Sequence, residues 1–164
     1  MQVVVAEATP LNYLILIEAA EVLPQLFTNI HIPIEVLTEL SSNDAPEIVR
    51  SWIQRLPAWI NVHRSEEIGA GDAAVNVLDL GERAAILLAE SLRADLLLID
   101  EREGATLAER RGLTVTGTLG LLDLAASRGL IDLRDAFARL QKTNFRYPPS
   151  LIEKILKEDE GRKK

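Results

Sequence analysis

The sequence contains no cysteine, and other residue types that often carry chemistry are scarce. Without thiols there can be no disulfide, no thiolate metal site and no cysteine nucleophile. Two histidines, His31 and His63, are too few for a multi-histidine zinc centre. Aromatic residues make up 4% of the chain, so stacking platforms for single-stranded nucleic acid are sparse. Catalytic chemistry in this protein must therefore rest mainly on carboxylates.

Long apolar runs and an excess of basic charge are also missing. No segment reaches the roughly 18 apolar residues that cross a bilayer, and the first ten residues lack the basic region of a secretory signal. We therefore expect no membrane segment and a cytoplasmic protein, with which the absence of cysteine agrees. Acidic residues outnumber basic ones by 25 to 18, a net charge of −7, which disfavours a generally basic nucleic-acid-binding surface.

The 164 residues contain enough apolar sequence, 48%, for one full core. We predict a single domain over residues 1–158, followed by a charged tail at 159–164. Short apolar strands alternate with helical segments, and this alternation predicts a three-layer α/β fold with a short, mostly parallel sheet flanked by helices. The predicted strands lie at 3–5, 30–32, 58–62, 96–99 and 113–115. Residues 64–77 form the most loop-like stretch, and Gly69-Ala70-Gly71 within it lacks the lysine of a phosphate-binding P-loop.

Two acidic residues fall where a parallel sheet places its ligand site. Ligands of open α/β sheets bind outside the carboxyl ends of the strands. Glu7 directly follows the first strand, and Asp100 directly follows the strand at 96–99. We expect these carboxylates to lie at one edge of the sheet, although each could instead cap the helix that follows it. Thr9 and Pro10 predict the N-cap and the first residue of the first helix.

Two glutamates on predicted helices extend this set. Glu82 lies on the apolar side of a helix over 81–93, where a carboxylate needs a partner or a cation. Asp79 and Glu82 also match a capping box, and the sequence leaves both roles open. On an earlier helix Glu39 borders the apolar face, whereas Glu35 points away and is expected to be solvated. The candidate site therefore contains Glu7, Glu39, Glu82 and Asp100.

This order of acids on an α/β pattern resembles the PIN-domain family of metal-dependent ribonucleases, and within it the VapC-like branch of bacterial and archaeal toxins. The family's opening strand and turn are matched by VVVAEATPL, and its second acidic motif by IPIEVLTEL. The most specific likeness runs from LDLGERAAILL through the Thr116–Thr118 turn to TLGLL. Since it continues to PPSLIEKIL, the resemblance covers nearly the whole chain.

The resemblance implies a metal-dependent endoribonuclease of toxin–antitoxin type. Its catalytic and metal-binding residues would be Glu7, Glu39, Glu82 and Asp100, with Glu7 and Asp100 as the principal ligands of Mg²⁺ or Mn²⁺. Carboxylate oxygens suit these hard cations without help from histidine or cysteine. The resemblance also implies an RNA substrate, a small antitoxin protein as partner and a homodimer.

Three positions depart from the family pattern. Glu7 stands where the family usually has Asp, Ala84 where related sequences often carry a second acid, and Leu98 where many members have Thr. These differences favour, as an alternative, a catalytically impaired PIN-fold nucleic-acid-binding or regulatory module. A third hypothesis is a flavodoxin-like phosphotransfer or signalling domain that uses Asp100.

Overall fold

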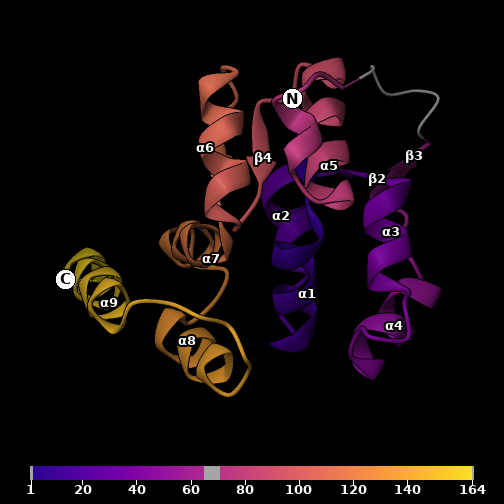
Figure 1. Ribbon diagram of the computed structural model, residues 1–164. Coiled ribbons are helices and arrows are strands. Elements are labelled where there is room, and N and C mark those ends of the chain that lie inside the picture. Colours follow the sequence, from indigo (N-terminus) through magenta and orange to yellow (C-terminus); the bar gives the residue numbers. More distant parts are fainter. Residues whose placement is uncertain (1, 65–70, 164) are drawn as a thin grey trace.

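The structure, a computed structural model, describes residues 2–64 and 71–163, and within them five parallel strands form a central sheet (Figure 1). The strands are β1 (Val4–Ala6), β2 (Ile30–Pro33), β3 (Ile60–His63), β4 (Leu96–Leu98) and β5 (Val115–Thr116). Their order across the sheet is β3-β2-β1-β4-β5, and every neighbouring pair is parallel. The prediction of an α/β fold around a short parallel sheet is confirmed.

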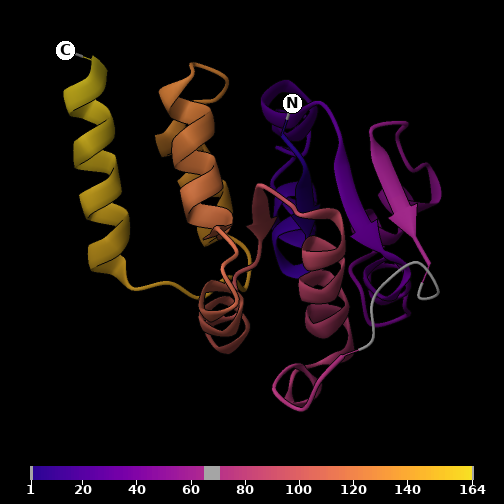
Figure 2. The same ribbon diagram turned by 90° about the horizontal axis from the view of Figure 1, so that it is seen from above.

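Helices cover both faces of the sheet, so the sheet is the middle of three layers (Figure 1 and Figure 2). They are α1 (Ala8–Leu16), α2 (Val22–Phe27), α3 (Ile34–Leu40), α4 (Glu47–Gln54), α5 (Leu80–Leu92), α6 (Arg102–Arg110), α7 (Thr118–Ser127), α8 (Leu133–Gln141) and α9 (Pro149–Lys163), with a 3-10 turn over Val75–Val77. On one face Val5 and Leu97 pack with α5 and α6. On the other face Val4 and Leu98 pack with α1, α2 and α7. Successive side chains of each strand thus enter different cores.

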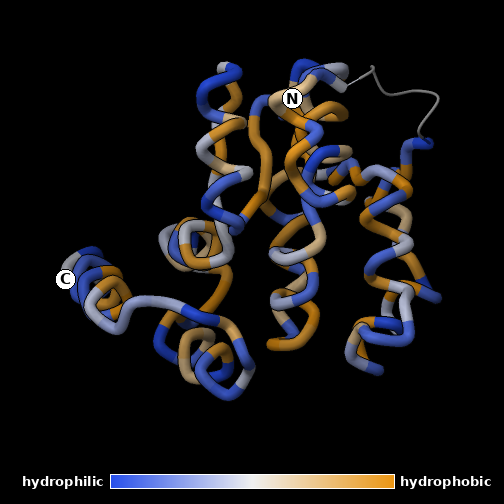
Figure 3. Tube along the Cα trace, viewed as in Figure 1, coloured by the Kyte–Doolittle hydropathy of each residue, from blue (hydrophilic) through white to orange (hydrophobic). Residues whose placement is uncertain are grey.

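Burial on both faces explains why the central strands read as continuous apolar runs. Every residue of β1 is fully buried, and in β4 only the first residue is partly exposed. Figure 3 shows hydrophobic colour along β4, whereas the helices around it alternate between hydrophobic and hydrophilic turns. None of the helices in residues 2–64 and 71–163 is both long and apolar enough to cross a membrane.

Helix α2 has no clear signal in the sequence. The chain turns at Glu18, which has a left-handed φ of +60° although it is not glycine, and α2 follows with Pro24 inside its first turn. Turn propensities alone therefore miss one helix between β1 and β2.

Of the loop predicted over 64–77, residues 65–70 lie outside the described residues, and so does most of the Gly69-Ala70-Gly71 turn.

The charged C-terminal segment is helical in the structure. Helix α9 packs against α7 and α8 and continues to Lys163. Within it, buried Asp159 pairs with Arg162 at 2.9 Å, and Arg162 also pairs with Asp123 of α7 at 2.8 Å. The predicted tail at 159–164 therefore continues this helix as far as residue 163, while the domain boundary at residue 158 stays a prediction.

The two histidines contact each other across neighbouring strands. The Nδ1 atom of His31 on β2 lies 2.9 Å from the Nε2 atom of His63 on β3. Burial, followed by the neighbouring His63, lowers the pKa of His31 below its usual value. Neither histidine is among the groups that perturb the candidate carboxylates.

Leu98→Ala is expected to lower the free energy of unfolding by about 2–5 kcal/mol, because it leaves a cavity in a strand that helices cover on both sides. Leu98 is 0% exposed, whereas Leu151 on α9 is 39% exposed. The matched control Leu151→Ala should therefore change stability by about 0.5 kcal/mol or less. Urea denaturation measures both, and equal losses would contradict this placement of the core.

Candidate active site

The strand order changes direction between β1 and β4, at the centre of the sheet. These strands are neighbours but are not consecutive in the chain. After β1 the chain enters α1, which packs on one face, and after β4 it enters α6, which packs on the other. Such a switch point, at the carboxyl ends of two parallel strands, is where open α/β sheets bind ligands. Glu7 and Asp100 follow these two strands, as the sequence predicts.

Glu7 is 3% exposed and lies directly after β1. Its backbone N–H donates to the carbonyl oxygen of Leu98 on β4 at 2.9 Å, which extends the pairing of the two strands. Its carboxylate accepts from the backbone N–H of Thr9 at 3.1 Å and from the Thr9 hydroxyl at 3.4 Å. Glu7 is therefore the N-cap of α1, and the expectation that Thr9 holds this position is wrong.

The charge of Glu7 is unfavourable in this position. The pKa of Glu7 is raised to about 8, mainly by burial and to a smaller extent by the nearby carboxylates of Glu39, Glu82 and Asp100, against the opposing effect of the Thr9 hydrogen bond. The capping role thus accounts for only part of the environment of Glu7. The other part is a set of like charges that includes every other predicted site residue.

Asp100 is fixed by the start of α7. Its carboxylate accepts from the backbone N–H of Thr118 at 2.7 Å and from the Thr118 hydroxyl at 2.5 Å. Burial raises the pKa of Asp100, while these two bonds lower it. A Cβ atom on Gly117 would lie 2.5 Å from the Asp100 carboxylate, so glycine is required for this close approach. Asp100 does not cap the helix that follows it, because the N-cap of α6 is Glu101.

Glu82 is 8% exposed near the start of α5. Asp79 is the N-cap residue of α5 but makes no side-chain capping bond, so the first half of the predicted capping box is absent. The pKa of Glu82 is raised to about 7, first by burial and then by the nearby acids Asp79, Glu101, Glu39 and Glu103. A structural role at the helix start therefore does not account for this buried carboxylate.

Glu39 lies at the end of α3. The residue is exposed to solvent, and its carboxylate points towards α5. A Cβ atom on Gly81 would lie 3.4 Å from its Oε1 atom, and partial burial followed by the charge of Asp79 raises the pKa of Glu39. Glu35, on the same helix, is half-buried and its Oε1 atom is inaccessible to solvent. The prediction that Glu35 is solvated is therefore wrong, because the packing of α3 covers more of the helix than its apolar stripe.

The four predicted carboxylates share an environment without basic partners. Within the described residues, none of the four forms an ion pair, although arginines elsewhere pair with other acids. The acidic field also includes Asp79, which the sequence places in a capping box, and Glu101 and Glu103, which the predicted site does not contain. The DERE sequence over residues 100–103 is the only signal for Glu101 and Glu103. Uncompensated carboxylates at this density favour either protonation or a bound cation.

The donor set fits a hard divalent cation in type and charge. As placed, however, no group of three or more Asp, Glu or His side chains in residues 2–64 and 71–163 is close enough to hold a metal ion. Since Thr118 holds Asp100 and Thr9 holds Glu7, a change of rotamer at Glu39 and Glu82 would be needed to bring the oxygens together. The residues therefore fit a cation by chemistry, and their present rotamers do not enclose one.

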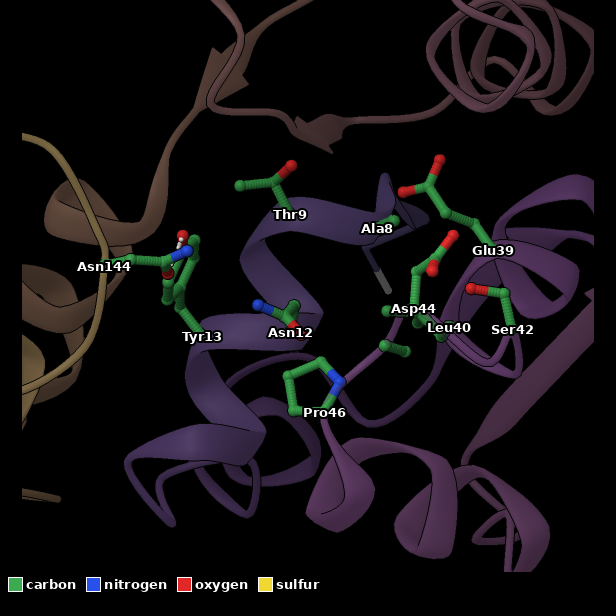
Figure 4. A pocket seen from close by; sticks show the side chains of 11 residues that line it. Ala8, Thr9, Asn12, Tyr13, Glu39, Leu40, Ser42, Asp44, Pro46 and Asn144 are labelled. Carbon is green, nitrogen blue, oxygen red and sulfur yellow. Dashed lines mark hydrogen bonds between the residues drawn. The ribbon is translucent and has the colours of Figure 1, made fainter.

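A pocket of about 360 Å³ adjoins the carboxylates on the α1 side of the sheet (Figure 4). Thr9 and Glu39 belong both to this pocket and to the acidic site. The other polar side chains that line it are Asn12, Tyr13, Ser42, Asp44 and Asn144. In the view of Figure 4, Asn144 and Tyr13 lie on one side of the pocket and Asp44 and Glu39 on the other. Asn12 lies between these two pairs. The acidic edge is therefore continuous with a polar cavity.

These features define an α/β protein with a carboxylate site at the switch point of a parallel sheet. A family model described as a PIN domain matches residues 3–160, and the chain belongs to the PIN-domain family. A search among curated proteins finds no match. PIN domains are in general nucleases that use divalent metal ions, which supports a nuclease-type function acting on nucleic acid. The predicted family is thus confirmed, whereas its VapC-like branch stays a prediction.

Glu7→Gln is expected to stabilise the protein at pH 8 and not at pH 4.5. Between 4.5, its ordinary pKa, and about 8, its pKa in the folded state, the folded protein binds more protons than the unfolded chain, so stability falls as pH rises. Glutamine keeps an acceptor for the Thr9 N–H and removes the charge. The gain at pH 8 should reach up to a few kcal/mol in urea denaturation. Exposed Glu47→Gln is the control, and a gain that is equal at both pH values would contradict the account.

Thr118→Val is expected to raise the pKa of Asp100, because valine removes the hydroxyl donor and keeps the backbone N–H. A carboxyl ¹³C NMR titration measures this pKa directly. Loss of a hydrogen bond to a charged group should also lower the free energy of unfolding by roughly 1.5–3 kcal/mol. Thr118→Ser, which keeps the hydroxyl, should leave the Asp100 pKa close to that of the unaltered protein. An unchanged pKa in Thr118→Val would mean that this bond does not hold the carboxylate.

Proposed function

We propose that the protein is a metal-dependent endoribonuclease of the PIN/VapC toxin type, which hydrolyses RNA phosphodiesters. The observation that carries the proposal is the gathering of four carboxylates with raised pKa values at the switch point, with no ion pair to any of them within the described residues. Such a site is unfavourable without a cation and becomes favourable with one. A cation held there by Glu7, Glu39, Glu82 and Asp100 would also offset the local negative charge, so that the net charge of −7 need not prevent binding of an RNA phosphate.

In this proposal Glu7 and Asp100 are the principal ligands of Mg²⁺ or Mn²⁺, and Glu39 and Glu82 complete the cluster or position the attacking water. A bound divalent cation would activate a water and stabilise charge on the scissile phosphate. Thr118 orients Asp100 through its two hydrogen bonds, and Thr9 orients Glu7. Glu82, with its pKa near 7, is suited to accept a proton at neutral pH.

The biological context is part of the same proposal. A toxin–antitoxin role, a small antitoxin partner, a homodimer and a cytoplasmic location are supported by the resemblance that runs from LDLGERAAILL to TLGLL. RNA, rather than DNA, is the substrate that this resemblance favours.

A second candidate function is a PIN-fold nucleic-acid-binding or regulatory module without cleavage. Two observations favour it: no three described carboxylates converge, and Ala84 is buried in α5 where related sequences often carry an acid. The flavodoxin-like hypothesis is wrong, because the chain belongs to the PIN-domain family and its strand order, 3-2-1-4-5, differs from the flavodoxin-like order.

Purified protein with Mn²⁺ is expected to cleave a folded RNA that contains single-stranded loops, and Asp100→Asn should lower the cleavage rate by roughly 10²-fold or more. Glu109→Gln is the matched control. Glu109 is exposed in the last turn of α6, which leads away from the carboxyl edge of the sheet, so its variant should cleave at the unaltered rate.

Two outcomes would contradict the nuclease proposal. Equal cleavage by the Asp100→Asn variant would indicate a contaminating nuclease or a different site. No cleavage by the unaltered protein, together with no heat of Mn²⁺ binding in calorimetry, would favour the regulatory module.

A further inference from the structure

The pocket beside the carboxylates contains polar groups that the proposed cleavage does not use. Asn12 comes from α1, Asp44 from the loop between α3 and α4, and Asn144 from the segment after α8. Three distant parts of the chain therefore present two amides and a carboxylate to one cavity. Because Thr9 and Glu39 also line it, a ligand in this cavity would lie next to the proposed cleavage site.

The amide of Asn144 is held in one orientation. The Tyr13 hydroxyl donates to its Oδ1 atom at 2.7 Å. The Tyr13 ring is itself fixed by an edge contact with Phe145, with ring centroids 4.9 Å apart. Since the Asn144 carbonyl is occupied, its NH₂ group is left to donate to an acceptor on a ligand.

Asn12 and Asp44 are open to a ligand. Asn12 is half-buried, and neither its amide nor the Asp44 carboxylate makes a hydrogen bond or an ion pair within the part of the chain that the structure describes. Asp44 can only accept hydrogen bonds when ionised, whereas Asn12 can donate and accept. The cavity thus offers a carboxylate acceptor near Glu39 and amide donors on the side of Tyr13 (Figure 4).

A basic residue, Arg146, follows Asn144 closely in the chain. It is exposed and lies two positions after Asn144, which accepts from the Tyr13 hydroxyl. The charge of Arg146 opposes the effects of burial and of Asp100 on the pKa of Tyr13. An arginine in this position is suited to bind an RNA phosphate. The pocket therefore adjoins the carboxylates through Thr9 and Glu39, and Arg146 follows closely after the lining residue Asn144 in the chain.

We propose that this pocket binds one unpaired guanine base of the RNA strand, adjacent to the phosphate that is cleaved. The proposal rests on the proposed ribonuclease function. Guanine is the RNA base that presents two neighbouring donors, N1–H and N2–H₂, and one carboxylate such as Asp44 accepts both. Its O6 and N7 atoms are acceptors for amide N–H groups such as those of Asn144 and Asn12. A cavity of about 360 Å³ is within the range that holds a ligand of this size.

Calorimetric titration with 5′-mononucleotides, without divalent metal, tests the subsite. The unaltered protein should bind GMP about tenfold more tightly than IMP, which lacks the N2 amino group, and more tightly than AMP. Asp44→Asn should make the affinities for GMP and IMP equal. The amide has only one acceptor oxygen and no charge, so it cannot accept from N1–H and N2–H₂ together as the carboxylate does. This ratio is unaffected by the general gain in nucleotide affinity that follows from removal of a negative charge. Asn144→Ala should weaken GMP binding, and Asn76→Ala, an exposed asparagine outside the pocket, should not.

The outcomes separate the subsite from the cleavage proposal. Selective GMP binding without RNA cleavage would support the subsite and contradict the proposed nuclease. RNA cleavage without any difference among GMP, IMP and AMP would overturn the subsite and leave the nuclease intact. A GMP preference that persists in Asp44→Asn would also overturn the subsite as assigned.

Discussion

Burial of carboxylates at the centre of the sheet, with repulsion among them as the smaller effect, is the constraint on which the proposed function depends. Parallel pairing of β1 with β4 brings Glu7 and Asp100 to one edge, and α3 and α5 add Glu39 and Glu82. No basic side chain in the described residues pairs with them. The ionised forms of these carboxylates are therefore unfavourable at the switch point, and a bound divalent cation is the simplest group that would stabilise them.

The surrounding residues hold this arrangement rather than neutralise it. Thr118 fixes Asp100 with two hydrogen bonds, and the lack of a side chain at Gly117 permits the close approach. Thr9 fixes Glu7 through its backbone N–H and hydroxyl. Donors of this kind stabilise the charged form of a carboxylate without supplying a positive charge, so the site stays negative and able to attract a cation.

Much of the architecture could be predicted from the sequence because both faces of the sheet are buried. Runs such as residues 3–5 and 96–99 are apolar at every position, which identifies buried parallel strands, and the acids that follow them then fall at one edge. The positions of Glu7 and Asp100 were predictable for this reason. Helix α2 was not, because it follows a left-handed Glu18 that no turn residue marks.

Details of the site depend on tertiary contacts that sequence spacing cannot give. The partner of Asp100 is 18 residues away, at the start of α7, and the only signal for it was the Thr-Gly-Thr turn. The exposure of Glu35 and Glu39 was predicted in the wrong order, because helical periodicity gives the apolar stripe and not the extent to which neighbouring elements pack on α3. The pocket draws on α1, the α3–α4 loop and residue 144, so its residues could not be grouped before the fold was known.

The central claim, that the four carboxylates bind a divalent cation, is tested most directly by the proton release that accompanies metal binding. Titration of Mn²⁺ at pH 7 in two buffers of different ionisation enthalpy measures the protons exchanged per ion bound. Because Glu7 and Glu82 have pKa values of about 8 and about 7, Mn²⁺ should displace protons from them, and Asp100→Asn should abolish most of the binding. Absence of Mn²⁺ binding, or binding of equal affinity in Asp100→Asn without proton release, would contradict the account.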